Sequence, residues 1–236
     1  MTHFEEMQIL ESMEILVDTR EQRTSKAEQR YNSFGVPYSR TTLAYGDYTA
    51  NFVLLDGGKL YDISKTINPI CVVERKMNLD ELAQCFTHSR ERFEREFQRA
   101  VENNCFIHLI CEEGSYEKIE GHKYKSKFPP KSFLASITAW ERRYNIHFHF
   151  CSSLESGRLI KEFLYRDMKD CNDTFEIKND KVDWQKTAKF ATIPYTMPVV
   201  CLIGDNAKNN NNINKFFILM RMKNHFNKMG KALLGA

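Results

Sequence analysis

Hydrophobic and polar residues follow two different periods along the chain, and these periods predict strands that alternate with helices. Short apolar runs that end in polar residues predict buried strands at 14–21, 70–76, 105–111 and 146–151. Apolar residues three and four positions apart predict helices at 24–35, 79–101, 131–145 and 155–168. Alternation over 38–55 favours a hairpin that turns near Gly46 and Asp47, followed by a tight turn at 56–59.

The order of these elements predicts an α/β fold. Strands that alternate with helices typically form one sheet with helices on both of its faces. The near-continuous apolar run at 105–111 is typical of a central parallel strand. A polar, lysine-rich segment at 114–130 is expected to be a loop.

The pattern changes after residue 168, so the chain divides into 1–168 and a C-terminal extension, 169–236. Residues 197–206 predict one buried strand, and the asparagine-rich 207–215 predicts a loop. Residues 216–236 predict a basic amphipathic helix. Core packing, a dimer face and DNA contact remain three open roles for this helix.

Composition restricts the class of protein. A hydrophobic fraction of 42% is enough for a folded core. No apolar run reaches the roughly 18 residues of a membrane span, and the acidic N-terminus lacks the order of a secretory signal. The seven cysteines are scattered without CxxC spacing, which argues against a disulfide framework or a zinc site. An intracellular protein with no membrane partner is expected.

Charged residues cluster where strands are expected to end. Asp18 and Glu21 follow one strand, Asp47 lies in a turn, and Glu74 and Lys76 end another strand. Because residues two apart in a strand share a face, Glu74 and Lys76 are expected to be neighbours. Carboxylates joined from such segments can hold Mg²⁺ or Mn²⁺ beside an ammonium, an arrangement suited to phosphodiester hydrolysis.

The segments VDTRE (17–21), YGDY (45–48), VVERKMNLD (72–80) and RERF (90–93) occur in an order that resembles the XPF-type structure-specific endonuclease family. The nuclease core of that family is restriction-endonuclease-like, of the PD-(D/E)xK superfamily. The resemblance covers residues 13–168 and implies a central mixed sheet flanked by helices on both faces. It also implies a metal-dependent DNA endonuclease that acts on branched, flapped or nicked DNA.

The resemblance assigns expected roles to individual residues. Asp47 and Glu74 would be the main ligands of Mg²⁺ or Mn²⁺, Asp18 would complete or support the metal site, and Lys76 would act on the attacking water. Asp80 fills the last position of the motif and is expected to belong to the catalytic set. Glu21 would support the site. No nucleotide cofactor is expected, and paired nuclease domains imply a homodimer.

Basic residues around these motifs are the candidates for DNA contact. They are Arg20, Arg75, Arg90, Arg92, Lys123 and Lys125. The loop that carries the two lysines is equally compatible with a solvated surface.

Simpler interpretations stay open for each acid. Glu74, with Arg75 and Lys76, is compatible with surface ion pairs that contribute little. Asp18 and Glu21 are compatible with a solvated strand end, Asp47 with an ordinary turn residue, and Asp80 with a favourable charge at a helix start. Residues 169–236 show no glycine-bearing hairpin repeats, which leaves the preferred DNA structure open. A non-catalytic DNA-binding subunit and an RNA-acting nuclease are the alternative functions.

Overall fold

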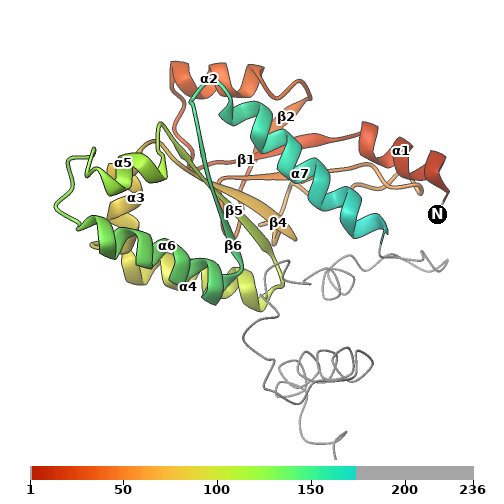
Figure 1. The fold of residues 1–236 in the computed structure, drawn as a ribbon. Helices are drawn as coiled ribbons and strands as arrows, with labels where there is room; N and C mark the ends of the chain where they lie inside the picture. The colour runs from red at the N-terminus through yellow and green to blue at the C-terminus, as the bar shows by residue number, and fades with distance from the viewer. Residues whose placement is uncertain (1, 174–236) are drawn as a thin grey trace, which may run out of the picture. The chain divides into compact units, whose positions relative to one another are not determined.

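Residues 2–173 of the computed structural model contain a six-stranded mixed sheet in the order β2-β1-β3-β4-β5-β6 (Figure 1). The two strands at one side are parallel, β3 is antiparallel to both of its neighbours, and β4, β5 and β6 run parallel. The strands are β1 (Glu14–Asp18), β2 (Tyr38–Thr41), β3 (Tyr48–Asn51), β4 (Cys71–Lys76), β5 (Phe106–Glu112) and β6 (Ile146–Cys151).

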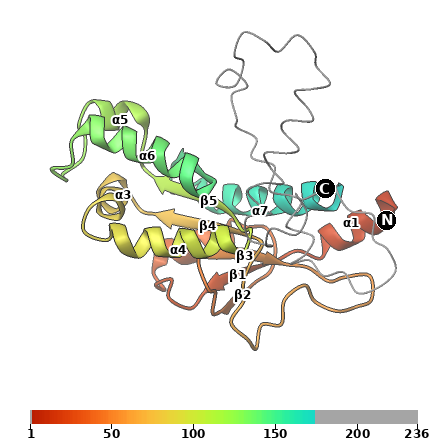
Figure 2. The ribbon, with the colours of Figure 1, turned by 90° about the horizontal axis from the view of Figure 1, so that it is seen from below.

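Helices cover both faces of this sheet (Figures 1 and 2). The first face carries α1 (His3–Glu11), α2 (Ser25–Asn32) and α7 (Ser156–Asp173). The second carries α3 (Leu79–Phe86), α4 (Arg90–Glu102), α5 (Tyr116–Glu120) and α6 (Pro130–Tyr144). The predicted α/β class is therefore confirmed. Within residues 2–173, no helix has the length and apolar character needed to cross a bilayer.

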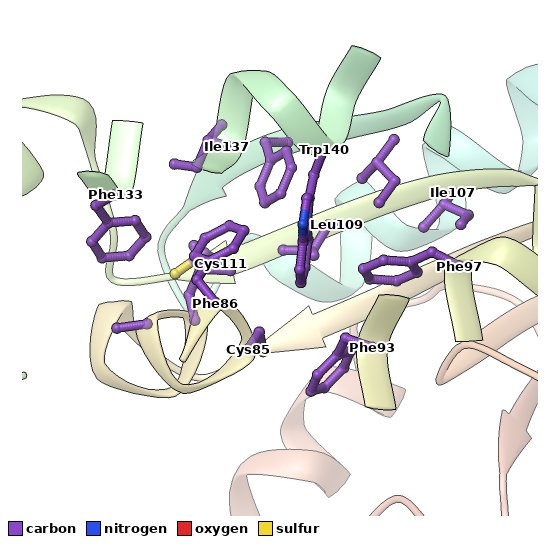
Figure 3. Close-up of a cluster of buried hydrophobic side chains, with 14 of the residues drawn as sticks. Cys85, Phe86, Phe93, Phe97, Ile107, Leu109, Cys111, Phe133, Ile137 and Trp140 are labelled. Carbon is purple, nitrogen blue, oxygen red and sulfur yellow. The ribbon is translucent and has the colours of Figure 1, made fainter. Parts of the chain in front are cut away.

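An aromatic core packs α3, α4 and α6 against the second face (Figure 3). The Phe86 ring lies 4.4 Å from the Trp140 ring, and Phe97 meets Trp140 edge-on at 5.1 Å between ring centroids. All three side chains are buried. Because aromatic pairs add packing energy to a large buried area, this core holds α4 firmly against the sheet, chiefly at β5.

The first face is closed mainly by α7. Ile160, Leu164 and Met168 are buried in a cluster with β-strand residues such as Val73. Gly157, in the first turn of α7, lies so close to α2 that an added Cβ would stand 2.4 Å from the carbonyl oxygen of Arg30. This close approach of α7 and α2 accompanies a hydrogen bond from Arg30 of α2 to Glu112, at the carboxyl end of β5.

Strand pairing differs from the expected hairpin. β2 and β3 do not pair with each other, because β1 lies between them and bonds to both. The turn at Gly46 and the turn at 56–59 both exist, with positive φ at Gly46 and Gly57. Sequence alternation reports the faces of a strand but not its neighbours, so the hairpin prediction was wrong.

Helix boundaries also differ in places. The single helix predicted at 79–101 is two helices, because Thr87 leaves helical geometry and no apolar residue lies between Phe86 and Phe93. The short helices α1 and α5 were not predicted. Helix α7 continues past residue 168 to Asp173. The strand, loop and helix expected in 197–236 lie outside the described residues.

Candidate active site

A polar cleft of about 670 Å³ opens at the carboxyl end of β4. It is lined by acids and bases from loops, strands and helices far apart in the sequence. Among them are Glu21, Asp47, Glu74, Arg75, Lys76 and Glu112. The structure therefore brings together two predicted metal ligands, Asp47 and Glu74, and Lys76, which was predicted to act on the attacking water.

Glu74 and Lys76 share one face of β4, as the two-residue period requires. Both side chains are buried, and the Lys76 ammonium donates a hydrogen bond to Oε1 of Glu74. The same ammonium lies 4.5 Å from the centroid of the Phe93 ring on α4. Paired and cation–π contacts are the usual means of keeping a lysine charged inside a protein.

Asp47 reaches this cleft from the turn before β3. Gly46 has φ of +75°, and a Cβ added there would come within 2.6 Å of the Val72 Cβ, so the turn needs glycine. The Asp47 amide donates to the Val73 carbonyl at 3.0 Å. The Arg75 amide in turn donates to Oδ2 of Asp47 at 2.8 Å. These bonds hold the Asp47 carboxylate beside the end of β4.

The electrostatics of the group are unbalanced. Burial, followed by the negative charge of Glu74, raises the pKa of Asp47 to about 8. Burial also raises the pKa of Glu74, and Lys76 offsets only part of that rise. For Lys76, burial opposes the charged form, but nearby negative charge, chiefly that of Glu74, outweighs burial and raises its pKa. One ammonium thus compensates two desolvated carboxylates incompletely.

The donor set fits a hard dication. Oδ1 of Asp47 and Oε2 of Glu74 accept no hydrogen bond from the described residues, so each carboxylate keeps an oxygen for a ligand. Residues 2–173 hold no group of three or more His, Cys, Asp or Glu side chains arranged to bind a metal. Mg²⁺ commonly uses one or two carboxylates and completes its shell with water and substrate phosphate, so two acids suffice.

Four charged side chains form a ring that borders the cleft, and two of them, Arg30 and Glu112, were not predicted from the sequence. Arg30 of α2 donates to Glu21 and to Glu112, each at 3.1 Å. Arg75 donates to the same two glutamates, at 3.3 and 3.2 Å. The Tyr48 hydroxyl adds a 2.7 Å bond to Glu21. Arg75 is therefore held by protein carboxylates, which weakens its expected role as a phosphate contact.

Asp18 lies outside the cleft lining. Its buried carboxylate accepts bonds from the backbone and guanidinium of Arg20 and from the Leu43 amide, all between 2.7 and 3.2 Å. Both oxygens are occupied, so Asp18 orders the chain after β1 and is not retained as a metal ligand. Arg20 remains 59% exposed and lines the cleft.

Asp80 also lies outside the cleft lining. Its Oδ1 accepts hydrogen bonds from the amides of Lys125 and Ser126, both at 2.7 Å. The carboxylate therefore shapes the lysine-rich loop instead of reaching Asp47 and Glu74. Lys123 is exposed on that loop, and its Nζ lies 3.6 Å from Oε1 of Glu117.

The two helix arginines occupy different positions. Arg92 is exposed on α4 and lines the cleft, whereas Arg90 donates to Glu94 at 3.0 Å and does not line it. The cleft lining also includes Glu81, Glu96 and Arg99. Glu96 accepts a 3.2 Å hydrogen bond from the Gly46 amide. Glu96 and Arg99 were not predicted as site residues, although their spacing of four and seven residues from Arg92 places them on the same side of the helix.

Comparison with known proteins gives one match at the family level. The ERCC4 domain matches residues 17–163. No curated protein matches the chain in sequence. Two solved structures are similar to this chain. One is XPF from Aeropyrum pernix, which is 18% identical, with 72% of this chain and 68% of that chain covered and a TM-score of 0.48. The other is XPF from Aeropyrum pernix in complex with DNA, which is 23% identical, with 65% of this chain and 63% of that chain covered and a TM-score of 0.44.

Proposed function

Because this chain belongs to the ERCC4 domain family, a family of nucleases, we propose that it is a metal-dependent endonuclease that hydrolyses phosphodiester bonds of DNA. The observation that carries the proposal is the shared cleft of Asp47, Glu74 and Lys76. Two incompletely compensated carboxylates beside an ammonium suit a divalent cation and a phosphate better than a neutral ligand.

Each side chain has a distinct part in the proposed reaction. Asp47 and Glu74 would hold Mg²⁺ or Mn²⁺ through Oδ1 and Oε2, the oxygens that accept no hydrogen bond from the described residues. Such an ion would supply polarisation of a phosphoryl oxygen and a water molecule of lowered pKa. Lys76, whose pKa is raised chiefly by the charge of Glu74, would orient the attacking water and stabilise the negative charge that develops on the phosphate.

Substrate contacts come from the rim of the cleft. Arg92 is exposed there and forms no ion pair within the described residues, so it can neutralise a phosphate beside the scissile bond. Arg20 is also exposed there, but its guanidinium is already paired with Asp18, so its contribution to phosphate binding is expected to be smaller. Lys123 and Lys125 lie on the loop ordered by Asp80 and extend the basic surface. A preference for branched, flapped or nicked DNA, a homodimer and an intracellular location remain predictions from the sequence.

Cleavage of labelled linear, flapped and branched DNA, single-stranded DNA and RNA, with Mg²⁺, Mn²⁺ or a chelator, tests the proposal. We expect metal-dependent cleavage of DNA that Asp47→Asn reduces at least about 100-fold, because loss of an outer-shell partner alone costs 10–100-fold. Asp56→Asn, at an exposed turn, is the matched control. Binding of DNA without any cleavage would instead identify a non-catalytic subunit, and preferential cleavage of RNA would identify an RNA-acting enzyme.

A further inference from the structure

A second hollow, of about 730 Å³, lies along the outer side of α4. Arg92, Arg95 and Arg99 line it, and Tyr144 of α6 contributes to its wall. Arg92 and Arg99 also line the catalytic cleft. The two hollows therefore share a border, and a polymer that leaves the cleft over α4 enters the second hollow.

The three arginines form one row on the helix surface. Their spacing of three and four residues places them on the same side of α4, and all three are exposed. Seven residues of helix extend about 10 Å, since each residue rises 1.5 Å. One strand of duplex DNA carries a phosphate about every 3.4 Å along the axis, so this arginine row matches about three phosphates.

The positive charge of the arginine row is available to a ligand. Within the described residues, Arg92 and Arg99 form no ion pair, and Arg92 lies over the Phe93 ring at 4.7 Å. The Arg95 side chain is 71% exposed. Its ion pair with the exposed Glu91 is long, at 3.8 Å between Nη1 and Oε2. The other acid of the hollow, Glu94, accepts a hydrogen bond from Arg90.

We propose that this arginine row binds the phosphate backbone of the duplex DNA arm that leaves the catalytic cleft. The inference rests on the proposed nuclease function and adds the path of the substrate beyond the scissile bond. A backbone contact is favoured over base stacking because the Tyr144 ring packs on Phe97 and Trp140, with centroids 6.0 and 6.2 Å apart.

Salt-dependent binding tests the arginine row in the full chain. The probe is a labelled flapped DNA with a long duplex arm, titrated in chelator so that it is not cut. For Arg95→Gln/Arg99→Gln, we expect weaker binding and a slope of log K against log salt that is smaller by about 0.9 for each lost contact. Arg95→Lys/Arg99→Lys keeps both charges and should retain most of the slope.

The matched control is Arg166→Gln, an exposed arginine on α7 that covers the opposite face of the sheet. Thermal unfolding of each variant establishes that it is folded. An unchanged slope in the double glutamine variant overturns the proposal, and so does an equal loss per charge in Arg166→Gln. Mg²⁺-dependent cleavage by the unaltered chain is measured separately, so loss of the arginine row and failure of the nuclease assignment give different results.

Discussion

The Arg75 amide donates a 2.8 Å hydrogen bond to Oδ2 of Asp47, although 28 residues separate the two in sequence. The antiparallel ladder between β3 and β4 is short and pairs only Tyr48 with Val73. Beyond this ladder, the Asp47 carboxylate accepts the hydrogen bond of the Arg75 amide. Because the end of the ladder leaves a donor for the carboxylate, strand pairing itself sets the position of the proposed metal ligand relative to Glu74.

Lys76→Met should destabilise the protein strongly. It leaves the buried Glu74 carboxylate without its cation, which costs about 3–5 kcal/mol of the free energy of unfolding. Glu74→Gln/Lys76→Met removes both charges and should recover much of this loss. Urea unfolding measures both variants.

The control for this pair is Lys59→Met, which breaks a partly exposed ion pair with Glu14. That change should cost no more than about 1 kcal/mol. An equally small cost for Lys76→Met would contradict a buried, mutually dependent pair.

Arg30→Met should also lower the free energy of unfolding. Glu21 and Glu112 would then share Arg75 alone, and breaking such a buried network costs about 3–5 kcal/mol. Arg30→Lys keeps the charge but lacks the planar fork that reaches two carboxylates, so an intermediate loss is expected. Chemical unfolding is again the measurement, and Arg166→Met, on the surface, should stay within about 0.5 kcal/mol of the parent. Equal stability of the Arg30→Met and Arg166→Met proteins would rule out a structural role for the ring.

Asp80→Ala distinguishes a loop-ordering acid from a catalytic one. Each hydrogen bond to a charged acceptor is worth about 1.5–3 kcal/mol, so hydrogen exchange at the amides of Lys125 and Ser126 should accelerate at least about tenfold. Cleavage should persist with weaker DNA binding. Asp80→Asn keeps an acceptor and serves as the control. Loss of cleavage with unchanged amide exchange would restore Asp80 to the catalytic set expected from the motif.

His149 should make the protein acid-sensitive. Burial, followed by the charges of His108 and His147, lowers the pKa of His149 from 6.5 to about 4. The unfolded chain therefore binds the proton more tightly, and stability should fall as the pH drops from about 6.5 towards 4. His149→Gln, which keeps a hydrogen-bonding group for His108, should flatten this part of the profile.

Thermal unfolding as a function of pH checks the expectation for His149. The exposed His88→Gln is the control and should follow the parent curve. A parent protein whose stability does not change between pH 6.5 and 4 would show that the histidine is not desolvated in the folded state.

Several features of the fold and the site were readable from the sequence. Apolar runs located β4, β5 and β6, and the period of a strand placed Glu74 and Lys76 on one face with Arg75 on the other. The glycine before Asp47 indicated the turn. These features depend on local backbone geometry, which acts over a few residues and therefore leaves a pattern in the sequence.

Tertiary structure decided which of the predicted acids meet. Asp18 and Asp80 lie in the right motifs, but their carboxylates are bound by Arg20 and by the amides of the lysine-rich loop. Arg30 and Glu112, 82 positions apart, join Glu21 and Arg75 because α2 packs against α7 and carries Arg30 to the end of β5. Side-chain partners depend on strand order and helix packing, which bring distant segments together, and no local pattern records that choice.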